Sequence, residues 1–103
     1  MIARLWHGMT KARKADEYLV YLHKTGIPDY TATPGNRGVS VLLRKENERA
    51  HFLLISYWES YDAIRRFAGD EIDKARYYHE DKRWLLELEP NVIHYDVAAG
   101  VNA

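Results

Sequence analysis

The spacing of apolar and polar positions changes from a strand-like to a helix-like pattern within residues 51–69. Phe52 to Ile55 form a continuous apolar run, which is typical of a strand covered on both faces. A helix is expected to begin at Ser60, because its hydroxyl can cap the first turn, and Asp62 adds negative charge at the positive end of the helix dipole. Gly69 is expected to end this helix. Its inward stripe is predicted to consist of Ala63, Ile64 and Phe67.

Four strands are predicted in all, and three of them carry apolar or aromatic residues on both faces. In the first of them, Trp6 falls on one face and His7 on the other, together with Leu5 and Met9. A short polar connection, residues 46–48, is expected to join the second and third strands as a hairpin. The four predicted strands are residues 2–9, 39–45, 49–58 and 92–98.

A helix is also predicted over residues 11–25. Gly26 is expected to end it and Pro28 to prevent its return, so residues 27–38 are predicted to form a loop whose tightest turn is Pro34-Gly35-Asn36. After the Ser60 helix, residues 70–88 keep helical spacing up to Pro90, and a further helical run is predicted there.

The predicted order of elements is β-α-β-β-α-β, a ferredoxin-like α+β fold in a single domain over residues 1–103. Such a sheet carries its helices on one face. The other face would expose apolar side chains in a monomer, so we expect a two-fold homodimer that packs the open faces together. The tail, residues 100–103, is expected to be frayed or to contact a partner.

Composition excludes several classes of function. The formal net charge is zero and no Lys/Arg block stands out, so neither nucleic acid nor an anionic membrane is an expected partner. Cysteine is absent, which excludes disulfides, thiol catalysis and thiolate metal sites. No apolar segment is long enough to span a membrane and no signal-peptide pattern is seen, so a cytoplasmic location is expected.

The segment Tyr57-Trp58-Glu59-Ser60, followed by Ala63 and Phe67, resembles the W-x-S-x-x-A-x-x-x-F signature of the antibiotic biosynthesis monooxygenase family. Residues 77–81 and 90–95 look similar to later parts of that family. The resemblance implies a dimeric α+β barrel in which each protomer holds a pocket between sheet and helices. Members include cofactor-independent oxygenases of polycyclic phenols and quinols, enzymes that degrade haem, and proteins with no known reaction.

The haem-degrading members rely on an Asn on the first strand and on a Trp and a His on the helices. By motif spacing, these positions hold His7, Phe67 and Tyr77 here, and no residue type matches. His79 is the nearest candidate axial ligand, but two further residues turn a helix by about 200°. Haem degradation of that type is therefore not expected, and no cofactor is expected.

Five histidines are present, but none shows the i, i+4 or His-x-His spacing of a metal site, so no metal is expected. His7 is the candidate catalytic base, because an apolar setting beside Leu5 and Met9 would keep its imidazole neutral. The alternative is a core histidine satisfied by a neighbouring hydroxyl. His79 is a further site candidate, and its alternative is a solvated helix end.

Aromatic residues are the candidate binding surface for a flat ligand. The predicted substrate-binding residues are Trp6, Phe67, Tyr77, Tyr78 and His79. The alternative is that these rings fill the core and a dimer interface, which is the role expected of Trp58. Three functions stay open: a cofactor-independent monooxygenase of a small aromatic or polyphenolic compound, a non-catalytic dimer that binds a small ligand or haem, and a structural dimer that assists a larger enzyme.

Overall fold

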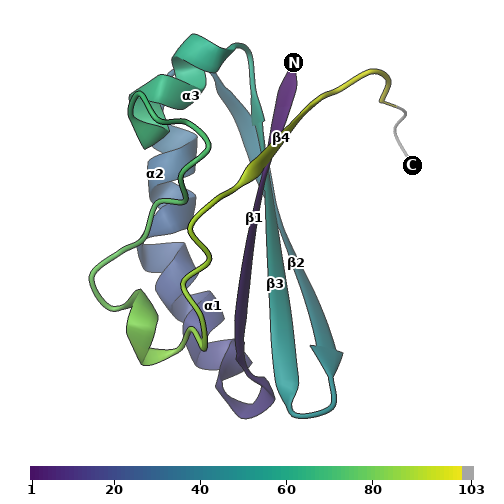
Figure 1. Ribbon diagram of the computed structural model, residues 1–103, viewed down its shortest axis with the longest axis vertical. Coiled ribbons are helices and arrows are strands. Elements are labelled where there is room, and N and C mark those ends of the chain that lie inside the picture. Colours follow the sequence, from purple (N-terminus) through teal and green to yellow (C-terminus); the bar gives the residue numbers. More distant parts are fainter. Residues whose placement is uncertain (101–103) are drawn as a thin grey trace.

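Four strands form one antiparallel sheet in the computed structural model, which describes residues 1–100 (Figure 1). Their order across the sheet is β2-β3-β1-β4. This arrangement confirms the predicted ferredoxin-like α+β fold. The prediction for the tail falls largely on residues 101–103, which lie outside the described part of the chain. The strands are β1 (Ile2–Lys11), β2 (Asn36–Glu46), β3 (Arg49–Trp58) and β4 (Ile93–Asp96).

The helices all lie on one side of the sheet (Figure 1). They are α1 (Ala15–Lys24), α2 (Gly26–Ala32) and α3 (Tyr61–Ala68), with short 3-10 turns η1 (Ala12–Lys14) and η2 (Asp81–Arg83). We call the covered side of the sheet the helix face and the other side the open face. Within residues 1–100 no helix is both long and apolar enough to cross a membrane.

The two-residue period of the central strands decides which side chains enter the core. Along β1, Arg4, Trp6 and Thr10 are buried on the helix face, whereas His7 lies half-buried on the open face. The neighbouring strand β3 follows the same rule: Phe52, Leu54, Ser56 and Trp58 are buried on the helix face.

Helix α3 forms as its sequence predicts. The Ser60 hydroxyl accepts a hydrogen bond from the backbone N–H of Ala63 at 3.1 Å, and Asp62 lies in the first turn. Gly69 follows the helix with φ 84°, a conformation that favours glycine. The predicted inward residues Ala63, Ile64 and Phe67 are buried.

The predicted loop after Gly26 is wrong in its first half, because the chain forms α2 there. Pro28 does not prevent this helix, since it lies in the first turn, where its missing N–H would have no helical partner. The break between α1 and α2 falls instead at Thr25 (φ −123°, ψ −86°). The turn at Pro34-Gly35 is present, with Gly35 at φ 91° and the Asn36 N–H donating to the Thr33 carbonyl.

The predicted helix over residues 70–88 is also wrong, because only η2 is helical there. We call residues 69–92 the covering segment. Its backbone pairs with distant groups: the Leu86 N–H donates to the Met9 carbonyl at 2.8 Å, and the Ala75 N–H to the Pro90 carbonyl at 2.9 Å. These long-range bonds use the donors that a helix would need. The segment runs back along the helices before it enters β4 (Figure 1).

Candidate functional site

Five aromatic side chains meet between the helix face of the sheet and the helices. Tyr30 and Phe67 stack with ring centroids 4.5 Å apart, and all five rings line one cavity of about 20 Å³. That volume suffices for about one water molecule. We call these residues the aromatic cluster; they are Trp6, Tyr18, Tyr30, Phe67 and Tyr78.

Gly8 shapes the floor of the cluster. A Cβ atom at this position would collide with the six-membered ring of Trp6, and it would also crowd Leu85. The indole of Trp6 therefore lies over the backbone of β1, where only glycine leaves room. Trp6 also meets Tyr77 edge to face, with centroids 6.1 Å apart.

Asp81 places a buried carboxylate at the edge of the cavity. It accepts hydrogen bonds from the Tyr18 hydroxyl at 3.1 Å and from the backbone N–H of Tyr78. Burial raises the pKa of Asp81, and these two donors counteract part of that effect. The pKa of the Tyr18 hydroxyl is raised as well, chiefly by burial and then by the charge of Asp81. A buried carboxylate with a raised pKa is a candidate proton acceptor.

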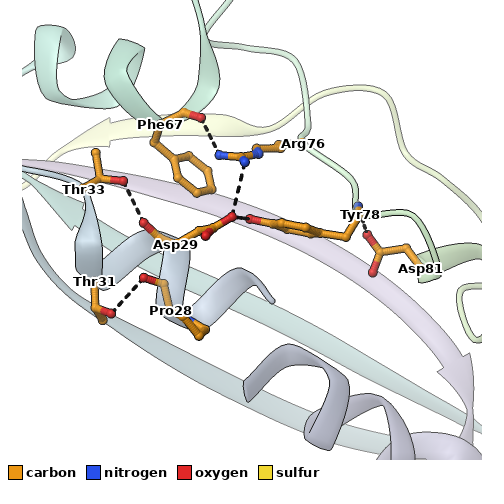
Figure 2. Close-up of polar contacts among 8 residues, drawn as sticks. All are labelled: Pro28, Asp29, Thr31, Thr33, Phe67, Arg76, Tyr78 and Asp81. Carbon is orange, nitrogen blue, oxygen red and sulfur yellow. Dashed lines mark hydrogen bonds and ion pairs between the residues drawn. The ribbon is translucent and has the colours of Figure 1, made fainter. Parts of the chain in front are cut away.

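The covering segment is joined to α2 and α3 by a polar cluster centred on Asp29 (Figure 2). The Tyr78 hydroxyl donates to Asp29 Oδ2 at 2.7 Å, and Arg76 Nη2 lies 3.2 Å from the same oxygen. Arg76 Nη1 donates to the carbonyl of Phe67 at 2.8 Å, and its guanidinium lies 4.9 Å from the centroid of the Phe67 ring. Arg76 and Tyr78 thus hold the covering segment over the aromatic cluster.

Arg4 makes a second link to the covering segment. Its Nη2 donates to the Lys74 carbonyl at 3.0 Å and its Nη1 to the Ile72 carbonyl. Nη1 also lies 3.1 Å from His94 Nε2. Because a guanidinium only donates, His94 Nε2 accepts and its Nδ1–H donates to Asp73 at 3.2 Å. Burial lowers the pKa of His94, the charge of Arg4 lowers it further, and Asp73 opposes both.

We expect the free energy of unfolding to fall as the pH is lowered below about 6.5. The pKa of His94 is lower in the folded chain than in the unfolded one, so the unfolded chain binds the proton first as the pH falls. One proton gives a slope of at most about 1.4 kcal/mol per pH unit. Urea denaturation at several pH values measures this slope. His94→Gln should reduce it and His23→Gln, at an exposed position, should not; equal slopes in all three proteins would contradict the assignment.

The structure brings together only some of the predicted site residues. Trp6, Phe67 and Tyr78 line the same cavity, and Tyr77 packs beside Trp6. His79 is exposed in a turn and does not end a helix. His7 lies across the sheet from Trp6, because consecutive strand residues point to opposite faces. A catalytic base at His7 and a pocket wall formed by Trp6 therefore cannot belong to the same pocket within one protomer.

His7 also differs from its predicted apolar setting. Its Nδ1–H donates to the carboxylate of Glu89, and its Nε2 lies 3.1 Å from His51 Nδ1. The two imidazole rings stack, with centroids 5.3 Å apart. The partner is thus a carboxylate and a second imidazole, not a hydroxyl. His7 and His51 border an open-face recess of about 350 Å³, together with Leu42, Leu43, Arg44 and Leu53.

Sequence reasoning missed Arg4, Tyr18, Tyr30 and Asp81. A signal was present for Arg4, since a charged residue occupied an inward position of β1 between Ile2 and Trp6. Asp81 gave no such signal, because it follows His79 and Glu80 in a polar stretch that is typical of a solvated helix end. Its burial depends on contacts with Tyr18, which lies far away in the sequence.

The residues of the site do not fit haem, the cofactor of some proteins that the sequence resembles. All five histidines lie in the described part of the chain, and none of them is free to bind iron at the aromatic cluster. Four of them lie outside the cluster: His7, His23, His51 and His79. The fifth, His94, has both ring nitrogens in hydrogen bonds. A tyrosine ligand would bind iron as phenolate, yet burial raises the pKa of Tyr77 to about 12 and also raises that of Tyr78. Among residues 1–100, no group of three or more His, Asp or Glu side chains is arranged to hold a metal ion.

Comparison with known proteins adds information on the fold. No family model and no curated protein matches this chain. Among solved structures, the chain is similar to a variant of MhuD, with a TM-score of 0.63, 16% sequence identity and full coverage of both chains. That crystal structure holds two manganese protoporphyrin IX molecules per active site. At this identity the likeness establishes a shared ferredoxin-like α+β fold.

Proposed function

We propose that this chain forms a homodimer in which each protomer binds a small, flat aromatic compound between its sheet and its helices. The observation that carries this proposal is the aromatic cluster around a residual cavity, with the buried carboxylate of Asp81 at its edge. Aromatic walls with few polar groups are typical of sites for flat ligands.

Entry of such a ligand requires movement of the covering segment, because the present cavity is about 20 Å³. Leu85 and Val92 anchor this segment in the core, but the part over the cavity has no helix or strand and is held by the polar contacts of Arg76 and Tyr78 with Asp29. Local opening of such segments takes less free energy than global unfolding. Displacing Tyr78 and Arg76 would uncover Phe67 and Trp6 together.

The chemistry we propose is oxygenation of a phenol or quinol. Asp81 would accept the phenolic proton, and a ring carbon of the resulting anion would form a C–O bond with dioxygen, which is the oxidant. Loss of the C–H proton at that carbon and cleavage of the O–O bond would then release one water and leave a quinone. Asp81 replaces His7 as the candidate base because it lies on the same side of the sheet as the aromatic cluster. His7 would act from the open face. Loss of turnover in His7→Ala with an intact dimer would establish that role, and unchanged turnover would exclude it.

The dimer is proposed from the open face of the sheet. Apolar side chains remain exposed there on the two edge strands: Leu42 is 48% exposed on β2, and Ile93 and Tyr95 are 58% and 56% exposed on β4. Leu53 and Ile55 lie between them on β3. Packing against the same face of a second copy would remove this surface from water.

Oxygen consumption with naphthols and naphthalenediols tests the oxygenase proposal. Removing a general base costs about 10²–10⁴-fold in rate, so Asp81→Asn should lose at least 100-fold while retaining the ligand. Asp62→Asn is the matched control, since Asp62 is exposed on α3 and pairs with Arg65. Full turnover in Asp81→Asn would exclude Asp81 as base.

The same titrations distinguish the alternative of a non-catalytic binding dimer. Tight binding of these compounds without oxygen consumption would support that alternative. Binding of none of them, measured by calorimetry up to millimolar concentration, would contradict the proposed site itself.

A further inference from the structure

Arg4 is a buried cation without an anionic partner. The residue is 1% exposed, and no carboxylate among residues 1–100 lies within ion-pair distance of its guanidinium. Its partners are the backbone carbonyls of Ile72 and Lys74 and the neutral ring of His94. Buried charges are normally paired, because desolvation of an unpaired charge is costly.

The guanidinium also has a free donor. Nε of Arg4 is buried and has no hydrogen-bond partner in the described chain. A carboxylate binds a guanidinium through two parallel hydrogen bonds, one to Nε or Nη1 and one to Nη2. A carboxylate could therefore bind Arg4 through the free Nε and the neighbouring Nη2, which now donates to the Lys74 carbonyl.

A second buried donor lies two residues further along the same face of β1. The indole Nε1 of Trp6 is buried close to the Tyr77 hydroxyl, but it does not reach hydrogen-bond geometry with it. Trp6 lines the cavity, and the Phe67 ring that lines it as well lies 5.8 Å from the Arg4 guanidinium. Arg4 is thus one aromatic ring away from the cavity whose lining includes Asp81.

We propose that the site takes a hydroxylated aromatic carboxylic acid, with its carboxylate bound by Arg4 and its hydroxyl directed towards Asp81. This inference rests on the proposed function, because it places the ligand within the aromatic cluster. The carboxylate takes the free Nε and replaces the Lys74 carbonyl as acceptor for Nη2, whereas Nη1 keeps its bond to the Ile72 carbonyl. Binding therefore loosens the part of the covering segment that the Lys74 carbonyl holds in place.

The test compares 6-hydroxy-2-naphthoate with its neutral primary amide, 6-hydroxy-2-naphthamide, on the full chain by isothermal titration calorimetry. The two probes share the rings and the hydroxyl and differ in charge. Hydrogen bonds to charged groups contribute about 1.5–3 kcal/mol, so we expect the acid to bind at least about tenfold more tightly than the amide. Equal affinities would overturn the assignment of Arg4 and leave the aromatic site standing; binding of neither probe would overturn both.

Two arginine variants locate the preference. Arg4→Gln should bring the acid-to-amide affinity ratio to about one, whereas Arg66→Gln should leave it unchanged. Arg66 is a matched control, because its Nη1 also donates to a backbone carbonyl, that of Pro34 at 3.1 Å, but at an exposed position on α3. A ratio preserved in folded Arg4→Gln would overturn the proposal. A merely structural role of Arg4 would lower stability and change binding of acid and amide alike.

A third measurement does not depend on any variant. Hydrogen exchange of the wild-type amides in residues 73–76 should become faster with the acid than with the amide at equal saturation, because only the acid competes for Arg4. Equal or greater protection of these amides by the acid would overturn the proposed exchange of partners.

Discussion

Replacing Trp58 with alanine should lower the free energy of unfolding by about 3–5 kcal/mol, the range for truncating a fully buried large aromatic side chain. Trp58 is fully buried at the end of β3, where it packs against Phe67 with centroids 5.6 Å apart. Its indole N–H donates to the Ser56 hydroxyl at 2.9 Å, so truncation also removes a buried hydrogen bond. Urea denaturation monitored by far-UV circular dichroism measures the loss.

Trp84→Ala is the matched control for this prediction. Trp84 is half-buried on the covering segment and contacts Tyr21 with centroids 4.8 Å apart. Because less of its surface leaves water on folding, the same truncation should cost clearly less. A Trp58→Ala protein as stable as Trp84→Ala would show that Trp58 is not central to the core.

A single charge on the open face should prevent dimer formation. Leu53→Lys would place an ammonium in the middle of the proposed interface, beside His7 and opposite Leu42. Two-fold symmetry brings two such charges into the same interface, and burial of an unpaired charge costs several kcal/mol. Native mass spectrometry should show the mass of two chains for the wild type and of one chain for Leu53→Lys, with association weakened at least about 100-fold.

Val20→Lys controls for a general effect of added charge. Val20 is 53% exposed on α1, on the other side of the molecule from the open face. This variant should remain a dimer. A wild-type monomer, or a dimer that persists in Leu53→Lys, would contradict the proposed interface.

The fold could be predicted from the sequence wherever local chemistry decides the structure. The alternation in residues 2–9 and 49–58 determines which side chains reach the core, and the Ser60 cap and Gly69 determine where α3 begins and ends. The prediction from Pro28 was wrong because a proline in the first turn of a helix is tolerated, whereas one in the helix interior breaks it.

The covering segment could not be predicted, because its shape depends on contacts between residues far apart in the chain. Its helical spacing is real in the sequence, but Leu86 pairs with β1 and Trp84 packs on α1. The same limit applies to the site. Trp6 and Phe67 could be identified from the sequence as aromatic residues on one face of a predicted strand and of a predicted helix. The burial of Asp81, in contrast, follows from its contact with Tyr18.

The bonds from Arg4 to the covering segment end on the carbonyls of Ile72 and Lys74, and the bond from Tyr77 ends on the carbonyl of Glu89. Every residue type offers a carbonyl, so the side chains at positions 72 and 74 can change without loss of these contacts. Related chains could therefore keep the shape of this segment while sharing little of its sequence. Residues that donate, above all Arg4, would be the ones under constraint.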